Sequence, residues 1–477
     1  MLIGRDKEQQ ILLSALEADE SQLIAVYGRR RVGKTFLIRQ TYKNKFAFQH
    51  SGLSKGNTKE QINEFCESLR QYGLKNFVEP KNWSEAFHLL QRLLAKKPKG
   101  KKIIFIDELP WMDTHKSKFL ESLDHFWNGW ATEREDIVLI ICGSATSWII
   151  NKVIRNRGGL HNRVNRQIDL QPFTLKECRQ YADCKKLSIG DRELVEAYMV
   201  MGGVPFYWSF FQRGESVAKT IDRLFFEQNA ELKDEYDALY ESLFTNANSY
   251  MSIVKALSTV NAGMTRAQLL TATKLSNNTV FQKALRELEQ CGFIRKYQAY
   301  GNKNKEMMFQ LMDPFTLFYY HFLEGKNSRD EQFWQHSLGQ NNYNAWAGIA
   351  FERVCLWHER QIKAALGISG LRSNVCAWSY LPTTEEKLAG AAGGQIDLMI
   401  DRADGVINLC EMKFHKEPFL VTSSYAEKIR TRNAIFRERE NCRKALVNTL
   451  VTMYGIVNNK NSDVFDNILV ISDLLST

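Results

Sequence analysis

Continuous apolar runs mark three places in the first third of the chain. Residues 23–27, 103–106 and 137–142 carry no charged side chain, and runs of this length without polar alternation are typical of strands buried on both faces of a parallel sheet. A stretch of helical character, residues 36–40, follows the first run. We therefore expect an α/β core built on a parallel sheet.

The pattern is mainly helical over residues 166–246. Pro172 and Thr174 are suited to begin a helix, and the pair Gly202 and Gly203 interrupts a later one. The sequence predicts that a helical segment follows the core.

Three short helices and a hairpin are predicted between residues 247 and 312. Thr265 and Ser276 are the expected caps of the second and third helices, and Gly292 follows the end of the third. Two strand-like runs then flank the turn-rich residues 301–305. This order predicts a winged helix.

The predicted winged helix offers polar and basic side chains to DNA. Its third helix would enter a major groove while the wing meets phosphates. The expected contacts are Asn277, Asn278, Lys283, Arg286, Lys303 and Lys305. Glu287 and Glu289 dilute the basic face, so a winged helix that contacts only protein or acts as a rigid linker is the alternative.

Composition limits the class of protein. The chain has 477 residues, of which 44% are hydrophobic, and this length suits about three domains of ordinary size. No apolar run approaches the roughly 18 residues of a membrane helix, and the N-terminus lacks the pattern of a signal peptide. Nine cysteines are scattered singly, which argues against a disulfide scaffold and a zinc site. We expect a soluble cytoplasmic protein without a membrane partner.

The charge balance favours a polyanionic partner. The formal net charge is +10, and the basic residues form small clusters, such as residues 96–102 and 428–432, instead of one tail. Such a distribution indicates patches on folded surfaces. DNA is the expected partner.

Residues 28–35 match the phosphate-binding pattern GxxxxGK[ST] between the first apolar run and the predicted helix. Glycines allow backbone N–H groups to surround a triphosphate, Lys34 supplies a charge to the terminal phosphates, and the Thr35 hydroxyl can bind Mg²⁺. The positive end of the following helix adds to the attraction. The predicted nucleotide-binding residues of this loop are Gly28, Arg29, Arg30, Arg31, Val32, Gly33, Lys34 and Thr35.

Two carboxylates, Asp107 and Glu108, follow the second apolar run. In this Walker B pattern Asp107 is expected to hold the water shell of Mg²⁺, and Glu108 to polarise the attacking water. Ser144 follows the third run, where a polar side chain would lie beside the γ-phosphate, although serine after a strand is also a common helix cap. The guanine-reading pattern Asn-Lys-x-Asp is absent, so ATP is the expected nucleotide.

An acidic hairpin is predicted near the C-terminal end. Asp397 lies in one strand-like run, a turn occupies residues 403–405, and Glu411 and Lys413 lie in the next run. Period-two alternation places Glu411 and Lys413 on one face. Two carboxylates can bind Mg²⁺ while the lysine activates a water molecule, which is typical of PD-(D/E)XK nucleases.

The predicted metal ligands of this tail are Glu352, Asp397 and Glu411, and its predicted catalytic residues are Asp397, Glu411 and Lys413. Tyr425, Lys428 and Arg430 on the following helix are further candidates for DNA contacts. An inactive relic that only holds DNA is the alternative.

Several motifs together resemble the archaeal-type, AAA-related ATPases of the STAND neighbourhood. They are Gly4-Arg5 and residues 27–35, 105–111 and 202–207. The resemblance implies that residues 166–246 form a helical lid and that an arginine after the sensor strand completes the nucleotide site. Arg163 is the matching position, although its loop departs from the usual Leu-Tyr-Gly-Arg, and a simple surface arginine is the alternative.

The tail resembles the C-terminal domain that accompanies these ATPases, a domain of uncharacterised function related to restriction-like nucleases. Phe351-Glu352 and residues 395–397 and 411–413 carry this resemblance. It implies a restriction-endonuclease-like α/β domain.

The expected organisation is an ATPase core over residues 1–165, a helical lid over 166–246, a winged helix over 247–312 and a nuclease-like domain over 313–477. ATP binding and hydrolysis would be coupled to DNA binding and to metal-dependent DNA cleavage. The alternative is a STAND-like signalling switch whose tail is a non-catalytic binding module. A homo-oligomer and a protein partner remain open.

Overall fold

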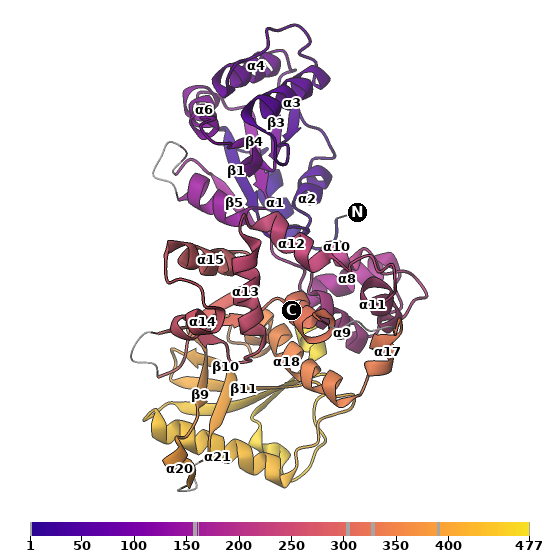
Figure 1. Ribbon diagram of the computed structural model, residues 1–477, viewed down its shortest axis with the longest axis vertical. Coiled ribbons are helices and arrows are strands. Elements are labelled where there is room, and N and C mark those ends of the chain that lie inside the picture. The colour runs from indigo at the N-terminus through magenta and orange to yellow at the C-terminus, as the bar shows by residue number, and fades with distance from the viewer. Residues whose placement is uncertain are drawn as a thin grey trace. The chain divides into compact units, whose positions relative to one another are not determined.

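The computed structural model describes residues 2–155, 160, 162–301, 306–325, 330–388 and 392–476. The chain divides into two compact units, an N-terminal unit over Met1–Pro172 and a C-terminal unit over Phe173–Thr477 (Figure 1). Within the described ranges, every helix is too short or too polar to cross a membrane.

A parallel sheet forms the centre of the N-terminal unit. Its strand order is β2-β3-β4-β1-β5. The three apolar runs of the sequence form β1, β3 and β4, whose residues are all buried, and the predicted α/β core is confirmed. The strands are β1 (Gln22–Tyr27), β2 (Phe48–Ser51), β3 (Lys102–Asp107), β4 (Ile137–Gly143) and β5 (Arg166–Asp169).

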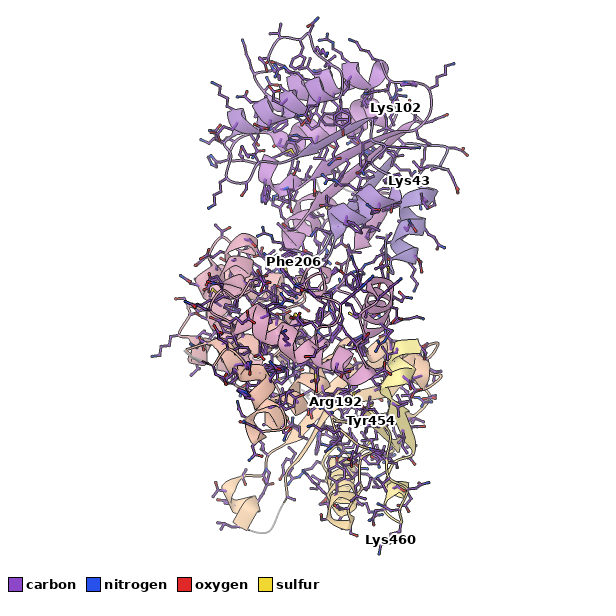
Figure 2. The ribbon with its side chains drawn as sticks, turned by 90° about the vertical axis from the view of Figure 1, so that its right-hand side faces the viewer. Lys43, Lys102, Arg192, Phe206, Tyr454 and Lys460 are labelled. Carbon is purple, nitrogen blue, oxygen red and sulfur yellow. The ribbon has the colours of Figure 1, made fainter. Side chains whose placement is uncertain are left out.

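Helices cover both faces of this sheet. Leu23 and Ala25 of β1 pack with α3, α4 and α6 on one face, whereas Ile24 and Val26 pack with α1 and α2 on the other, as the alternation of a strand requires. The helices are α1 (Asp6–Ser14), α2 (Lys34–Thr41), α3 (Thr58–Gln71), α4 (Trp83–Ala95), α5 (Leu109–Met112), α6 (Phe119–Phe126) and α7 (Thr146–Trp148), with π-helical turns at Trp127–Ala131 and Ile149–Ile154. Figure 2 shows Lys102 at the start of β3 and Lys43 just beyond the end of α2.

The N-terminal unit continues past residue 165, the predicted end of the core. The strand β5 pairs with β1 in parallel, and the unit ends at Pro172. Only Ile168 of the four residues in β5 is buried, so no apolar run marks this strand in the sequence.

Helices open the C-terminal unit. They are α8 (Leu175–Lys185), α9 (Asp191–Met201), α10 (Pro205–Trp208), α11 (Val217–Phe225) and α12 (Glu235–Leu243). Thr174 caps α8, as expected. One hydrophobic cluster extends from Phe173 through these helices to Leu474. The predicted divisions at residues 246 and 312 therefore stay predictions.

The middle segment contains three helices and a small antiparallel sheet of order β6-β8-β7. Thr265 caps α14, as expected. Asn278 caps α15 by accepting the backbone N–H of Phe281 at 3.0 Å, so the cap predicted at Ser276 is wrong. The elements are α13 (Ala247–Ser258), β6 (Met264–Thr265), α14 (Arg266–Thr273), α15 (Thr279–Gln290), β7 (Ile294–Gln298) and β8 (Met307–Leu311).

A five-stranded mixed sheet of order β13-β12-β11-β10-β9 forms the tail. Phe351 and Val354 of α18 (Asn341–Trp357) pack with Cys410 and Met412 of β11. Phe436 of α21 (Ser423–Arg439) packs in a cluster with Leu409 on the other side of the strand. The strands are β9 (Ser373–Tyr380), β10 (Gly394–Arg402), β11 (Val406–Lys413), β12 (Ala445–Thr452) and β13 (Asn467–Val470).

Several further helices lie in the C-terminal unit, and α18, α21 and α22 contact this sheet. The further helices are α16 (Pro314–Phe318), α17 (Phe333–Ser337), α18 (Asn341–Trp357), α19 (Glu359–Ala365), α20 (Thr384–Leu388), α21 (Ser423–Arg439) and α22 (Ile471–Ser476), with a π-helical turn at Tyr319–Leu323 and a 3₁₀ turn at Ser462–Val464.

Candidate functional site

The loop after β1 has the backbone of a phosphate-binding loop. Gly28, Arg31 and Gly33 have φ values of 143°, 71° and 92°, and α2 begins at Lys34 directly behind them. A Cβ atom at Gly28 would lie 2.3 Å from the carbonyl oxygen of Leu170, so a side chain does not fit there. The loop thus ends at the N-terminus of a helix. The positive end of the helix dipole favours the binding of an anion there.

Lys34 and Thr35 direct polar atoms toward this loop and the neighbouring strand. The buried Nζ of Lys34 donates hydrogen bonds of 2.9 Å to the carbonyl oxygens of Gly28 and Arg29. Oγ1 of Thr35 donates to Oδ2 of Asp107 at 2.7 Å. The predicted phosphate cation and the predicted magnesium ligands are therefore within one small region.

Asp107, Glu108 and Ser144 meet because β3 and β4 are adjacent parallel strands. Oδ1 of Asp107 accepts the backbone N–H of Glu108 at 3.0 Å. Oε2 of Glu108 accepts the backbone N–H of Ser144 at 3.1 Å and its hydroxyl at 3.0 Å. Ser144 thus holds the carboxylate of Glu108, a relationship that the sequence does not predict.

The other predicted residues of the nucleotide site differ in exposure. Arg29 is buried, Arg30 is exposed and Arg31 is half-buried, whereas Val32 lies in the core against α2. Arg163 is exposed, and its backbone N–H donates to the carbonyl oxygen of Leu160 at 3.0 Å. Residues 158, 159 and 161 of its loop lie outside the described residues, and its predicted role stays a prediction.

This set of donors suits a magnesium-bound nucleoside triphosphate. Thr35 and Asp107 offer hard oxygen ligands of the kind that Mg²⁺ prefers, and Lys34 offers a cation to phosphate oxygens. Glu108 lies next to them at the carboxyl edge of the parallel sheet, where open α/β folds bind ligands.

In the tail, the predicted carboxylates and lysine line one cavity of about 730 Å³, here called the carboxylate cavity. Leu398 pairs with Cys410 in the antiparallel hairpin of β10 and β11, which brings the neighbouring Asp397 and Glu411 to the same end of the two strands. The lining includes Glu352, Asp397, Glu411, Lys413, Tyr425 and Arg432.

Glu411 has basic and phenolic partners inside the carboxylate cavity. It forms an ion pair with the buried Arg432, accepts a hydrogen bond of 2.9 Å from the hydroxyl of Tyr425 and lies 3.6 Å from Nζ of Lys413. We expected Tyr425 to face DNA. Its hydroxyl is instead hydrogen-bonded to Glu411 inside the carboxylate cavity. Lys428 is exposed on the rim.

Asp397 and Glu352 form the other half of the cavity. Burial and the nearby charge of Asp397 raise the pKa of Glu352 to about 7. Nδ2 of Asn261 donates to Glu352 at 2.7 Å, and Nε2 of Gln395 donates to Asp397 at 2.5 Å. Across the described ranges, no group of three acidic, histidine or cysteine side chains is placed to hold a metal ion. Glu411 is paired with Arg432.

The predicted DNA-contacting residues of the middle segment are only partly available. Lys283 and Arg286 are exposed on α15, and Nζ of Lys283 lies 3.8 Å from Glu287. Asn278 is used as the helix cap, and Asn277 accepts a hydrogen bond from Arg266. Lys303 and Lys305 lie outside the described residues.

Sequence reasoning missed Arg432 and Asn261, which hold the tail carboxylates, and assigned Tyr425 to DNA contacts instead. Tyr425 and Arg432 are seven positions apart on α21 and reach the same carboxylate, and this spacing on one helix face is a signal that the sequence does contain. Asn261 contacts Glu352 from 91 positions away, and no local pattern marks it.

Comparisons with known proteins agree with the geometry of the N-terminal site. Residues 2–209 match a family model described as an ATPase domain predominantly from Archaea. An uncharacterized protein, MJECL04, of Methanocaldococcus jannaschii is 25% identical over 372 residues, which cover 74% of this chain and 76% of that protein.

Solved structures with some likeness include a Walker-type ATPase and an ORC2 protein. The Walker-type ATPase PABY2304 of Pyrococcus abyssi has 17% identity and a TM-score of 0.46 over 67% of this chain and 96% of that chain. The ORC2 protein of Aeropyrum pernix has 14% identity and a TM-score of 0.42 over 67% of this chain and 93% of that one. The family match locates an archaeal-type ATPase domain in residues 2–209. The prediction that the protein is an ATP hydrolase is thereby confirmed.

Proposed function

We propose that this protein hydrolyses ATP at the site formed by Lys34, Thr35, Asp107, Glu108 and Ser144, and that the nucleotide cycle controls DNA binding by the C-terminal unit. The observation that carries the proposal is the meeting of Thr35 with Asp107 and of Glu108 with Ser144 at one edge of the parallel sheet.

Each side chain has a distinct task in this proposal. Lys34 binds the terminal phosphates, and Thr35 and Asp107 hold the magnesium ion, which neutralises charge on the phosphates when it is bound. Glu108 orients the attacking water, and Ser144 fixes the Glu108 carboxylate. Arg163 is proposed to complete the site. Binding of ATP in this way would order the loop of residues 28–35 and change the relative populations of two conformations of the chain.

The test is steady-state phosphate release with and without DNA. Lys34→Ala should abolish ATP binding, whereas Glu108→Gln should bind ATP and turn over far more slowly. Lys43→Ala removes an exposed lysine beyond α2 (Figure 2) and serves as the control. Unchanged ATP affinity in Lys34→Ala would contradict the site, and turnover indifferent to DNA would contradict the coupling.

DNA binding through residues 247–312, proposed to be a winged helix, is supported by the net charge of +10 and by the exposed Lys283 and Arg286.

Metal-dependent cleavage in the carboxylate cavity is proposed as the activity of the tail. Glu352, Asp397 and Glu411 would hold the ion, Lys413 would activate water, and Glu411 would have to exchange Arg432 for the metal. Incubation with plasmid and Mn²⁺, with and without ATP, tests cleavage.

One observation favours a second candidate, a STAND-like signalling switch with a non-catalytic tail. The pairing of Glu411 with Arg432 and Tyr425 is also what a structural carboxylate would show. This candidate requires ATP binding without DNA-stimulated turnover or cleavage. A homo-oligomer, a protein partner and a cytoplasmic location stay predictions.

A further inference from the structure

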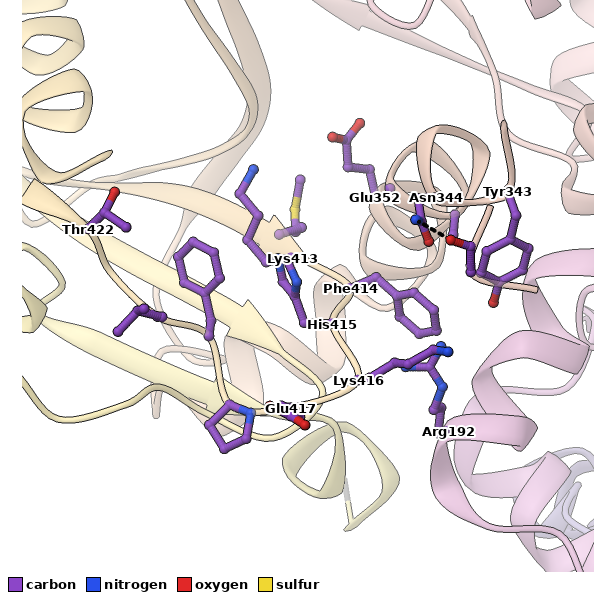
Figure 3. A pocket seen from close by; sticks show the side chains of 17 residues that line it. Arg192, Tyr343, Asn344, Glu352, Lys413, Phe414, His415, Lys416, Glu417 and Thr422 are labelled. Carbon is purple, nitrogen blue, oxygen red and sulfur yellow. Dashed lines mark hydrogen bonds between the residues drawn. The ribbon is translucent and has the colours of Figure 1, made fainter. Parts of the chain in front are cut away.

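A second cavity adjoins the carboxylate cavity within the C-terminal unit. It measures about 820 Å³ and shares Glu352, Met412 and Lys413 with its neighbour. In Figure 3, Glu352 and Lys413 lie toward the top of this cavity and Arg192 lies at its lower right. We call it the basic cavity.

The basic cavity takes its name from Arg192, Lys413 and Lys416, which all line it. The guanidinium of Arg192 lies 4.6 Å from the ring centre of Phe414 and pairs with Glu196 at 2.9 Å. Because its position is fixed from two sides, it needs little reordering to meet an anion.

Lys416 differs from Arg192 because it is exposed and forms no ion pair with any described residue. The acids of the lining are Glu352, shared with the carboxylate cavity, and Glu417, which is exposed. The free ammonium of Lys416 is therefore available to a phosphate group.

Two aromatic rings provide a different kind of surface. His415 and Phe419 lie with ring centres 5.0 Å apart and planes inclined by 32°, and His415 is exposed. Partial desolvation and the charges of Lys413 and Arg192 lower the pKa of His415 below its ordinary value, which favours the neutral ring. Neutral aromatic faces beside cations are the combination that binds unpaired bases and their phosphates.

The order of these residues along the chain indicates how a bound nucleic-acid strand would extend from one cavity to the other. Glu411 and Lys413 end β11, and residues 414–419 continue from that strand without an intervening element. A nucleic-acid strand with one phosphate at the carboxylate cavity would therefore find its neighbouring nucleotides at the basic cavity.

We propose that the basic cavity binds a segment of single-stranded nucleic acid that flanks the nucleotide held in the carboxylate cavity. Lys416 and Arg192 contact its phosphates, and His415 and Phe419 stack on a base. The inference rests on the proposed DNA-binding function and specifies its substrate as a strand with unpaired bases, because a duplex does not present base faces.

Photocrosslinking locates the strand directly. The full chain is irradiated with an oligo-dT that carries one 5-iododeoxyuridine, and the attached peptide is identified by mass spectrometry. Attachment to His415 or Phe419 is expected. Attachment only to other peptides, such as those of α15, would overturn the inference while leaving DNA binding by this protein in place.

Charge reversal measures the contribution of the cavity. Lys416→Glu should weaken binding of a fluorescent oligo-dT about tenfold or more at low salt. Lys233→Glu reverses the charge of an exposed lysine away from both cavities and should bind like the unmodified chain. If the two variants bound oligo-dT with equal affinity, the inference would be overturned, whereas the proposed DNA-binding function would not be affected.

Two further outcomes separate the inference from the proposed function. A duplex that binds as tightly as oligo-dT, with the same loss in Lys416→Glu, would overturn the specificity for unpaired bases. An unmodified chain with no affinity for either nucleic acid at low salt would overturn both the inference and the DNA-binding function, although ATP hydrolysis could still be measured.

Discussion

Oγ1 of Thr35 donates a hydrogen bond of 2.7 Å to Oδ2 of Asp107, although the two residues are 72 positions apart. They meet because β1 and β3 both pair in parallel with β4. This hydrogen bond brings together two oxygen ligands of the kind that Mg²⁺ prefers.

We predict that Thr35→Ala lowers the affinity for ATP in the presence of Mg²⁺ about tenfold, because one oxygen ligand is removed. Thr35→Ser keeps the hydroxyl and should retain the affinity. Calorimetric titrations with Mg²⁺ and with EDTA provide the measurement, and the difference between the variants should vanish in EDTA. A difference that persists without metal would contradict the assignment.

Ser144 should affect the rate of hydrolysis more than ATP binding. Its hydroxyl donates one of two hydrogen bonds to the Glu108 carboxylate, so Ser144→Ala should lower the turnover number about tenfold through loss of orientation. Ser122→Ala removes a serine whose hydroxyl only bonds to a helix carbonyl and is the control. Unchanged turnover in Ser144→Ala, measured by phosphate release, would show that the bond is not needed.

The exposed cations of α15 should contribute to the salt dependence of DNA binding. Replacing Lys283 or Arg286 by alanine should reduce the slope of log affinity against log salt concentration by about one unit for each phosphate that the variant no longer binds. Lys219→Ala, at an exposed position of α11, should leave the slope unchanged. Gel-shift titrations at several salt concentrations measure it, and identical slopes in all variants would exclude a role for these two cations.

The carboxylate cavity should bind Mn²⁺ through its half-buried acids. Asp397→Asn and Glu411→Gln should each weaken Mn²⁺ binding about tenfold or more, whereas Lys413→Ala should keep the ion and lose cleavage. Glu427→Gln alters an acid on the rim whose side chain is 71% exposed and serves as the control. Paramagnetic resonance of free Mn²⁺ provides the measurement, and equal affinities throughout would favour a structural role for Glu411.

Acidification should destabilise the C-terminal unit through His358. The backbone N–H of Leu175 donates to its Nε2 at 2.9 Å, and its Nδ1 donates to the carbonyl of Val354 at 2.7 Å. Burial lowers the pKa of this histidine from 6.5 to about 4. The unfolded chain thus takes up the proton first as pH falls, so the free energy of unfolding decreases between pH 6.5 and about 4, by about 3 kcal/mol at most.

Urea unfolding at several pH values measures this decrease. The free energy of unfolding of His358→Gln should depend less steeply on pH than that of the unmodified chain. His336→Gln, which alters an exposed position, should keep the steepness of the unmodified chain. The same steepness in all three proteins would mean that the pKa of His358 is the same in the folded and unfolded chains.

The sheet of the N-terminal unit could be predicted where burial is complete. Continuous apolar runs identified β1, β3 and β4 within one residue of each boundary. The outer strands β2 and β5 were missed, since Phe48–Ser51 and Arg166–Asp169 mix buried and exposed residues. Edge strands are covered on fewer sides, and their sequences therefore resemble those of loops.

The candidate sites were predictable as sets of residues, but their partners were not. Spacing alone placed Asp397, Glu411 and Lys413 on neighbouring strands, and the hairpin is present. The bond of Ser144 to Glu108 and the pairing of Arg432 with Glu411 depend on how separate elements pack. Helical spacing can place Tyr425 and Arg432 on one face, but a single sequence does not say which carboxylate that face meets.

The close approach of Gly28 to Leu170 has a consequence for how nucleotide binding is transmitted. The backbone N–H of Leu170 donates to the carbonyl of Tyr27 at 2.7 Å, and Arg5 donates to the carbonyl of Gln171 at 2.7 Å. Leu170 is thus hydrogen-bonded to Tyr27, the residue directly before the phosphate-binding loop. Because the carbonyl of Leu170 occupies the space where a Cβ atom at position 28 would lie, no space separates the loop from this peptide, and we expect a displacement of the loop to be accompanied by a displacement of Leu170.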